Sequence, residues 1–187
     1  TETTALTLAW ALYLTSIEPE TRARIRAEGE RVIGDREPVA ADYSALLYTR
    51  SVIQETMRLY PPIWGLIRIA ATDDTIGGKQ IKAGDKIVMF AYGAHHDARF
   101  WEEPEAFRPE RWMGEAAKKR TKYAYLPFGA GKRSCIGGAM SQVENTLALS
   151  KLLRRFEPEY TGPVPAPINA TVTLTPKGGL KFRVRER

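Results

Sequence analysis

The segment PFGAGKRSCIGG, residues 127–138, contains the only cysteine of the chain, Cys135. Two cations, Lys132 and Arg133, come just before this cysteine, and glycines lie on both sides of it. A thiolate is the reactive form of cysteine, and both nearby cations and a helix N-terminus favour it. A helical pattern begins at Cys135, so we expect the first helical N–H groups to point at the sulfur. The segment therefore predicts a thiolate that could be a nucleophile or a metal ligand.

Three interpretations of this thiol are open on the residues alone. A nucleophile needs a general base close by, and only His95 and His96 could supply an imidazole. A lone thiolate without companion ligands fits an axial ligand of haem iron. An isolated cysteine is also often an inert, buried side chain. The glycines allow a tight loop that a flat and bulky group could approach closely.

The pattern F-x-x-G-x-R-x-C-x-G runs from Phe128 to Gly137 and resembles the haem-binding loop of the cytochrome P450 family, the haem-thiolate monooxygenases. The resemblance implies that Cys135 is the axial ligand of the iron of haem b, iron protoporphyrin IX. Two arginines match positions where the family has cations for the anionic haem propionates. The implied cofactor contacts are Cys135, Arg133, Arg68, Phe128, Gly129 and Gly137.

A second motif is Glu55-x-x-Arg58 in QETMRLYPP, whose spacing places both side chains on one helical face. Arg111 in FRPERW matches the arginine that joins this pair in the family. The resemblance implies a buried, structural network of one carboxylate and two guanidinium groups, which requires the bidentate bonds of arginine. His95 lies where the family commonly has a histidine, and we assign it no chemistry, with a structural or propionate-contact role as an open alternative. The tryptophans are expected to pack rather than to contact the cofactor: Trp10, Trp64, Trp101 and Trp112.

The first residues, TETT, resemble the acid–threonine pair of the distal, oxygen-binding helix of the family. Glu2 and Thr3 match the pair, and the resemblance implies that Thr3, with Glu2, steers protons to the distal oxygen. The small residue and the glycine that precede the pair in the family would lie before Thr1. We therefore expect residues 1–187 to be the C-terminal portion of one cytochrome P450 domain whose N-terminal part is absent, with residues 127–137 as its haem-binding cysteine loop.

The implied activity is that of a monooxygenase, as part of a longer chain, that inserts one atom of O2 into an organic, hydrophobic substrate. Electrons would come from a ferredoxin, a flavodoxin or a flavoprotein reductase, because the sequence contains no phosphate-binding glycine loop of its own. A run of cations could steer an acidic partner, and a solvated basic loop is an equal alternative. These cations are Lys118, Lys119, Arg120, Lys122 and Lys132.

Three other functions remain open. Some relatives use peroxide or rearrange hydroperoxides, and they often depart from the acid–threonine pair that this chain retains. The chain could also be a fragment that is inactive without its N-terminal half. A basic binding module is the third alternative, since the net charge is +6 and the sequence pI about 9.5. No recognised nucleic-acid motif supports it, and we expect no nucleic-acid partner.

The elements that must position these residues follow from periodicity. Apolar spacing and proline positions predict helices over residues 4–15, 18–34 and 42–60, the second of them a charged surface helix. A fourth helix should begin at Cys135 and end before Pro158, and its apolar stripe would be Ile136, Met140, Val143 and Leu147.

Strand signals lie between and after these helices. Residues 63–92 contain hairpin signals around Gly-Gly and Ala-Gly-Asp, and the tail TVTLTPKGGLKFRVRE alternates like a hairpin. Residues 93–134 read as a long loop, which usually has a function. The fold class is therefore mainly α with small antiparallel β-sheets, as in the C-terminal half of the cytochrome P450 fold.

Composition adds limits to these expectations. A single cysteine excludes an internal disulfide framework and a cysteine-based structural zinc site. The start, TETTALTLAWALYLT, lacks the features of a signal peptide and is too short to span a bilayer. We expect a cytoplasmic protein, with a membrane anchor before residue 1 as an open alternative.

Overall fold

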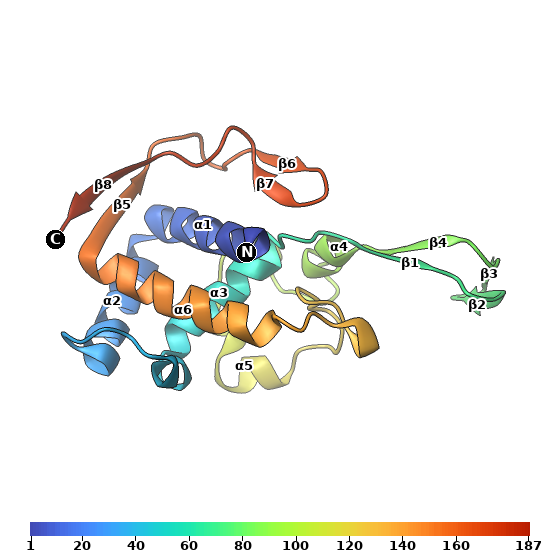
Figure 1. The fold of residues 1–187 in the computed structure, drawn as a ribbon, viewed down its shortest axis with the longest axis horizontal. Helices are drawn as coiled ribbons and strands as arrows, with labels where there is room; N and C mark the ends of the chain where they lie inside the picture. The colour runs from blue at the N-terminus through green and yellow to red at the C-terminus, as the bar shows by residue number, and fades with distance from the viewer.

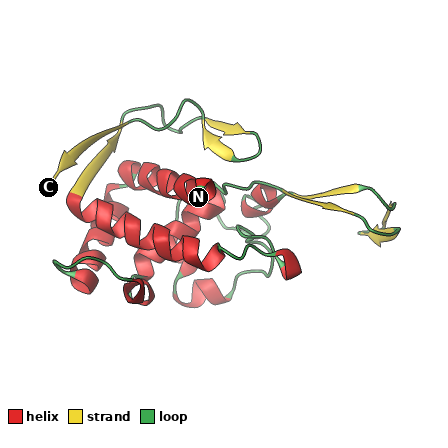
Figure 2. Ribbon diagram, in the orientation of Figure 1, coloured by secondary structure: helices red, strands yellow, loops and turns green.

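Helices form the body of the protein and short strands lie at its periphery (Figure 2). The computed structural model describes residues 1–187. The mainly helical fold with small antiparallel sheets is confirmed. The α-helices are α1 (Glu2–Ile17), α2 (Pro19–Ile33), α3 (Leu47–Leu59), α4 (Ala91–His95), α5 (Gly114–Lys118) and α6 (Gly138–Arg155). The 3-10 helices are η1 (Ala40–Ser44), η2 (Pro109–Trp112) and η3 (Gly131–Arg133).

The main core lies where α1, α2, α3 and α6 meet (Figure 1). Each of these helices contributes apolar side chains that are removed from water, which is the principal stabilising term of such a fold. The buried cluster consists of Ala11, Ile25, Tyr48, Val52, Ile53, Met57, Leu149 and Leu153. This core fixes α1, whose first turn contains Thr3, and α6, which begins just after Cys135, against α3.

Local sequence signals explain both ends of α2. Pro19 lies in the first turn of α2, where its missing N–H costs nothing, and Gly34 ends the helix with a φ of 61°. The helix predicted over residues 42–60 is shorter than expected. It begins at Leu47, because residues 40–44 form a separate 3-10 turn in which Asp42 accepts the Val39 N–H.

Four two-stranded antiparallel sheets surround the helices. The hairpin signals of residues 63–92 are confirmed: β2 and β3 turn at Gly77 and Gly78, which have positive φ angles. Together with β1 and β4 they form an arm that extends from the helical body (Figure 1). The pairs are β1 (Leu66–Ile69) with β4 (Lys86–Met89), β2 (Asp74–Ile76) with β3 (Lys79–Ile81), β5 (Phe156–Tyr160) with β8 (Phe182–Glu186), and β6 (Ile168–Ala170) with β7 (Leu174–Pro176).

The tail prediction is wrong in its pairing. The two expected strands, β7 and β8, form, but they do not pair with each other. β7 pairs with β6, and the Leu174 N–H also donates to the Pro62 carbonyl at 2.9 Å. β8 pairs with β5, the strand that follows α6. The partners are set by the rest of the fold rather than by the turn between the strands.

Two predictions about α6 are also wrong. The helix begins at Gly138 rather than Cys135, because Cys135 still belongs to a turn in which its carbonyl accepts the Gly138 N–H at 3.3 Å. The predicted apolar stripe does not face the core, since Ile136 and Met140 are exposed. The buried face is instead formed by Asn145, Thr146, Leu149, Ser150 and Leu153.

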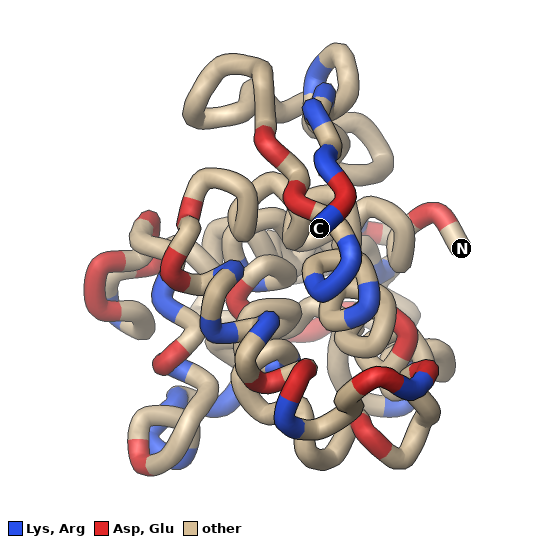
Figure 3. The backbone as a smooth tube through the Cα atoms, turned by 90° about the vertical axis from the view of Figure 1, so that its left-hand side faces the viewer, with Lys and Arg blue, Asp and Glu red and all other residues tan.

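Two further expectations need correction. The helix predicted as a surface helix, α2, buries one face that includes Ile25 and Glu28. The region 93–134, expected as a long loop, contains the short helices η2, α5 and η3 and the end of α4. Acidic and basic residues are interspersed over the backbone in the view of Figure 3. No helix of the chain is both long enough and apolar enough to cross a membrane.

Candidate functional site

The cysteine loop folds back on itself and leaves the thiol of Cys135 exposed. The backbone N–H of Cys135 donates to the Phe128 carbonyl at 2.9 Å, and this bond closes the loop. Gly129 and Gly131 have φ angles of 72° and 70°, a backbone region that residues with a Cβ rarely adopt. The glycines noted in the sequence therefore make this tight reversal possible.

The cysteine loop packs closely against the start of α6 and against β1. A Cβ added to Gly138 would come within 3.1 Å of the Phe128 ring, and a Cβ added to Gly129 would lie 3.3 Å from Leu66 Cδ1. A Cβ on Gly137 would approach the Cys135 sulfur to 3.9 Å. The close contact with the Phe128 ring favours glycine at position 138. The motif from Phe128 to Gly137 did not single out Gly138, although the pair of glycines in CIGG pointed to it.

A cavity of about 320 Å³ lies between this loop and the first turns of α1. Thr3 and Cys135 line it from different elements, and Arg133, Phe128 and Gly137 also face it. The remaining lining residues come from α1, from the α3–β1 region and from the two ends of the loop: Thr1, Thr4, Thr7, Met57, Pro62, Leu66, Pro127 and Ser141.

Three of the residues predicted for the site do not line this cavity. The carboxylate of Glu2 accepts a hydrogen bond from Thr173 Oγ1 at 3.3 Å. The guanidinium of Arg68 donates to the carbonyl of its neighbour Ile67 at 2.9 Å. Gly129 packs behind the loop, against Leu66. The cavity therefore joins five of the eight residues proposed for catalysis or cofactor binding.

The residues present fit a haem group. The cavity offers one exposed sulfur as a ligand, the cation of Arg133, and apolar walls from Phe128, Leu66 and Met57. A haem group has an iron that takes an axial ligand, an apolar ring and anionic propionates, and this combination of residues can hold all three. A residue larger than glycine at position 137 would narrow the cavity beside the sulfur, since its Cβ would lie 3.9 Å from the Cys135 sulfur.

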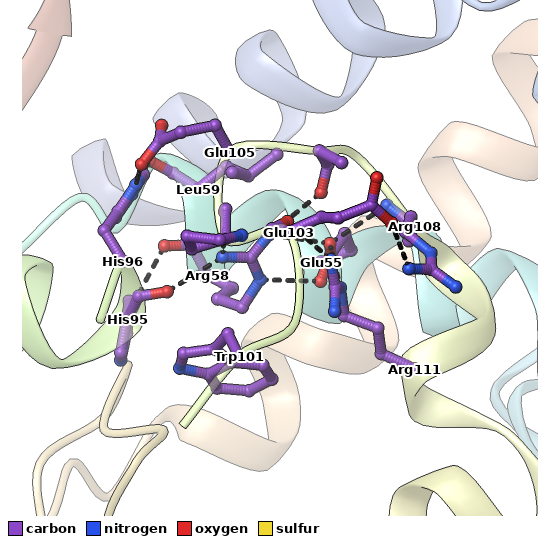
Figure 4. Close-up of polar contacts among 12 residues, drawn as sticks. Glu55, Arg58, Leu59, His95, His96, Trp101, Glu103, Glu105, Arg108 and Arg111 are labelled. Atoms are coloured by element: carbon purple, nitrogen blue, oxygen red, sulfur yellow. Dashed lines mark hydrogen bonds and ion pairs between the residues drawn. The ribbon is translucent and has the colours of Figure 1, made fainter. Parts of the chain in front are cut away.

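A buried charge network lies beside the loop, at the carboxylate of Glu55 (Figure 4). This carboxylate accepts five hydrogen bonds. Oε1 accepts from Arg58 Nη2 at 2.8 Å, from Arg111 Nε at 3.2 Å and from the Arg108 N–H at 3.0 Å. Oε2 accepts from Arg58 Nε at 2.9 Å and from Trp112 Nε1 at 2.8 Å. The structure thus brings Glu55, Arg58 and Arg111 together.

Arg58 is the centre of this network and is fully buried. Besides its two bonds to Glu55, it donates to the carbonyls of His95 at 2.8 Å, Pro104 at 2.6 Å and Ala106 at 3.1 Å. A guanidinium has five N–H groups in a rigid fork, so this set uses all of them. Arg58 therefore binds the segment that leads from α4 towards η2.

Trp112 is a member of the network that the sequence did not reveal. It was expected to pack rather than to contact the cofactor, and its indole N–H also donates to Glu55 at 2.8 Å. A buried tryptophan N–H usually finds a partner, and the position of Trp112 beside Arg111 in FRPERW was the available signal.

His95 connects this network to the cysteine loop. Its ring is fully buried, with Nε2 2.8 Å from the Leu126 nitrogen and Nδ1 3.2 Å from the Arg58 carbonyl. Burial lowers the pKa of His95 from 6.5 to about 4, so the ring is neutral at physiological pH. Because Nε2 must accept the Leu126 N–H, the ring proton lies on Nδ1 and is donated to Arg58.

Comparisons with known proteins agree with this geometry. A family described as Cytochrome P450 matches residues 1–182. Cyclooctat-9-en-7-ol 5-monooxygenase of Streptomyces melanosporofaciens is 40% identical over 155 residues, 83% of this chain and 34% of that protein. Protein LUTEIN DEFICIENT 5, chloroplastic, of Arabidopsis thaliana is 36% identical over 190 residues, 100% of this chain and 32% of that protein. Human Cytochrome P450 4V2 is 34% identical over 194 residues, 100% of this chain and 36% of that protein.

The chain belongs to the cytochrome P450 family, a family of haem proteins. It spans about a third of the length of the curated relatives cited here.

Proposed function

We propose that the protein is a haem-thiolate monooxygenase in which Cys135 is the axial ligand of haem b. The observation that carries the proposal is the cavity that Cys135 and Thr3 line from different elements. Residues 127–137 would form the haem-binding loop, and residues 1–187 the C-terminal portion of a single domain. The proposed reaction adds one oxygen atom of O2 to a substrate and releases the other as water, with two electrons and two protons supplied from outside.

The chain's own residues would have distinct tasks. Haem, when bound, supplies the activation of O2, which no protein side chain can perform alone. The Cys135 sulfur would donate electron density to the iron, and Arg133 would bind a propionate through charge-assisted hydrogen bonds. The Phe128 ring would pack near the macrocycle. The Thr3 hydroxyl would hold a proton at Oγ1 and pass it to oxygen.

Two residues would act from outside the cavity. Glu2 would serve Thr3 as a proton source, and its exposed carboxylate now bonds only to Thr173. Arg68 would need to release the Ile67 carbonyl to reach a propionate. Both roles remain part of the proposal because these side chains come from α1 and β1, the elements that contribute Thr3 and Leu66 to the cavity.

We propose an apolar organic substrate. The cavity walls contributed by Leu66, Met57 and Phe128 support this class. The Streptomyces relative is named as a monooxygenase of cyclooctat-9-en-7-ol, a compound whose name describes a largely hydrocarbon alcohol.

Electrons would come from an acidic ferredoxin, a flavodoxin or a flavoprotein reductase. Cations exposed on the chain before and within the cysteine loop support a partner of negative charge: Lys118, Lys119, Arg120, Lys122 and Lys132.

The ligand assignment is tested by the absorption spectrum of the full-length protein after reduction and addition of carbon monoxide. We expect the red-shifted Soret band of thiolate ligation in the parent protein. Cys135→Ala should abolish it, and Cys135→His should retain haem with an altered spectrum, because imidazole replaces the sulfur. Ser134→Ala is the matched control and should keep the parent spectrum.

An unchanged band in Cys135→Ala would overturn the assignment. The reaction class is tested separately by omitting the electron donor. Product formation with peroxide alone, at the rate of the complete system, would favour the peroxygenase alternative. Failure of residues 1–187 to bind haem, when the full-length protein binds it, would favour the reading of this segment as an inactive fragment.

A further inference from the structure

We infer that His95 is a positioning residue for Cys135, because it holds the entry of the cysteine loop by accepting the Leu126 N–H. The inference rests on the proposed function, in which Cys135 binds haem iron. It concerns a residue that is not among those that line the cavity.

The position of His95 results from reciprocal bonds between α3 and α4. Arg58 Nη1 donates to the His95 carbonyl at 2.8 Å, and His95 Nδ1 lies 3.2 Å from the Arg58 carbonyl (Figure 4). Arg58 is itself held by the two oxygens of Glu55. The imidazole is therefore fixed to a fully buried guanidinium that makes five hydrogen bonds.

From this anchor, hydrogen bonds continue to the cysteine. His95 Nε2 accepts the Leu126 N–H at 2.8 Å. The Leu126 carbonyl accepts the Gly129 N–H at 3.1 Å, and the Phe128 carbonyl accepts the Cys135 N–H at 2.9 Å. Each bond of this series fixes the start of the next turn, so a shift of Leu126 moves the loop that presents the sulfur.

The residues on either side of Leu126 offer no other backbone hydrogen bond that would fix the start of the cysteine loop. The residue after Leu126 is Pro127, which has no N–H to donate. The residue before it, Tyr125, donates its hydroxyl to the Gln54 carbonyl at 3.1 Å and lies beside the imidazole, with ring centroids 5.3 Å apart. Tyr125 binds to α3 through a side chain, whereas His95 is the partner that holds the backbone.

Only a neutral imidazole can perform this task. A protonated ring would carry a hydrogen on Nε2 as well as Nδ1 and would repel the Leu126 N–H. Full burial keeps the ring neutral at physiological pH. The histidine thus offers an acceptor to the loop and a donor to Arg58 at the same time.

Substitution of His95 by glutamine or asparagine distinguishes the contributions of the two ring nitrogens, because each side-chain amide can replace only one of them. A glutamine amide can reach the position of Nε2, whereas an asparagine amide reaches only the position of Nδ1. His95→Gln therefore retains the acceptor for Leu126, His95→Asn retains the donor for Arg58, and His95→Leu retains neither. Trp101→Phe is the matched control, because it removes a bond to the Ala94 carbonyl, also in α4, without altering Leu126.

The experiment uses the full-length protein loaded with haem and two readouts. The first is the fraction of reduced, carbon-monoxide-bound protein that retains the thiolate band after mild warming. The second is hydrogen exchange of residues 126–135. We expect His95→Gln and Trp101→Phe to resemble the parent protein. His95→Asn and His95→Leu should lose the thiolate band faster and exchange these amides about tenfold faster, the effect of losing one buried hydrogen bond.

Equal behaviour of the glutamine and asparagine variants, whether both are intact or both fail, would overturn the inference, because only one of them keeps the acceptor. The inference and the proposed function fail in different ways. A parent protein without a thiolate band would contradict the role of Cys135, and the exchange of residues 126–135 would still decide whether His95 fixes the loop.

Discussion

Glu55 shows how a charge can be buried at little cost. A carboxylate removed from water loses several kcal/mol of solvation, which is regained only when its oxygens are fully hydrogen-bonded. Here the side chain is fully buried and has five donors, two from Arg58 and one each from Arg111, Trp112 and the Arg108 backbone. Three of these donors belong to residues 108–112, so Glu55 holds this part of the 93–134 region against α3.

Trp112→Phe should measure the bond that the indole makes to this carboxylate. Phenylalanine retains most of the aromatic packing but removes the N–H, and a hydrogen bond to a charged group contributes about 1.5–3 kcal/mol. We expect a loss of that size in the free energy of unfolding, measured with denaturant. The control is Trp10→Phe, which removes a bond of 3.2 Å to the neutral Leu174 carbonyl and should cost about 1 kcal/mol. Equal losses would contradict the special role of Glu55.

Site residues that belong to a recognisable motif could be predicted from the sequence. Cys135, Arg133, Phe128, Gly137 and Thr3 line one cavity. The hydrogen-bond partners of Trp112 and His95 were not predicted, because each partner is more than thirty residues away. A motif specifies which residue types are present, but the direction of a single N–H or ring nitrogen is visible only after folding.

Among the elements, α3 depends on α2 for its first turn. The N-cap residue of α3, Leu46, has no side chain that could bind the free N–H groups. The carboxylate of Glu28, on α2, accepts the N–H groups of Tyr48 at 2.7 Å and Thr49 at 2.8 Å and also the Thr49 hydroxyl at 2.7 Å. An anion at a helix N-terminus is also favoured by the helix dipole. Glu28 thus caps the helix that carries Glu55 and Arg58.

Glu28→Gln should therefore destabilise the protein although the shape of the side chain is preserved. The amide keeps one acceptor and loses the charge, and we expect the free energy of unfolding to fall by about 1–3 kcal/mol. Glu144→Gln is the control, because Glu144 is exposed on α6, and surface changes of this kind stay within about 0.5 kcal/mol. A loss no larger than that of the control would show that Glu28 does not cap α3.

The face that α6 buries illustrates what periodicity leaves open. Ile136 and Met140 follow helical spacing, and so do Leu149 and Leu153. The structure buries the second pair, against α2 and α3, and exposes the first. Spacing predicts that a helix exists, but the choice between two apolar faces is made by the neighbouring helices.

Over the whole molecule, the least predictable feature was the pairing of distant strands. β5 and β8 are separated by more than twenty residues, and β6–β7 lies between them in the chain. The Pro-Lys-Gly-Gly turn suggested a local hairpin, yet both flanking strands have other partners. Strand preference depends on the packing that a strand finds rather than on its own residues, so local signals located the strands and not their sheets.

The stability of the whole molecule should depend on pH through His95. Its pKa is lowered from 6.5 to about 4, mainly by burial, with the neighbouring charges of His96 and Arg58 acting in the same direction. Between these two values the unfolded chain binds a proton that the folded protein excludes, so the free energy of unfolding must fall as the pH falls from 6.5 towards 4. The difference of about 2.5 pKa units corresponds to about 3 kcal/mol.

This loss can be separated from the titration of carboxyl groups. The pKa values of Asp42 and Asp97 are lowered from 3.8 to about 2, each mainly by a hydrogen-bonded arginine, so their contribution is lost only below the His95 window. Denaturant unfolding of the full-length protein at pH 7, 6, 5 and 4.5 measures the slope. His95→Gln has no titrating ring and should remove most of the decrease in this range. If the variant and the parent protein lose stability equally between pH 6.5 and 4.5, then His95 is not the group that takes up the proton on unfolding, and the neutral tautomer that bonds Leu126 and Arg58 loses its main support.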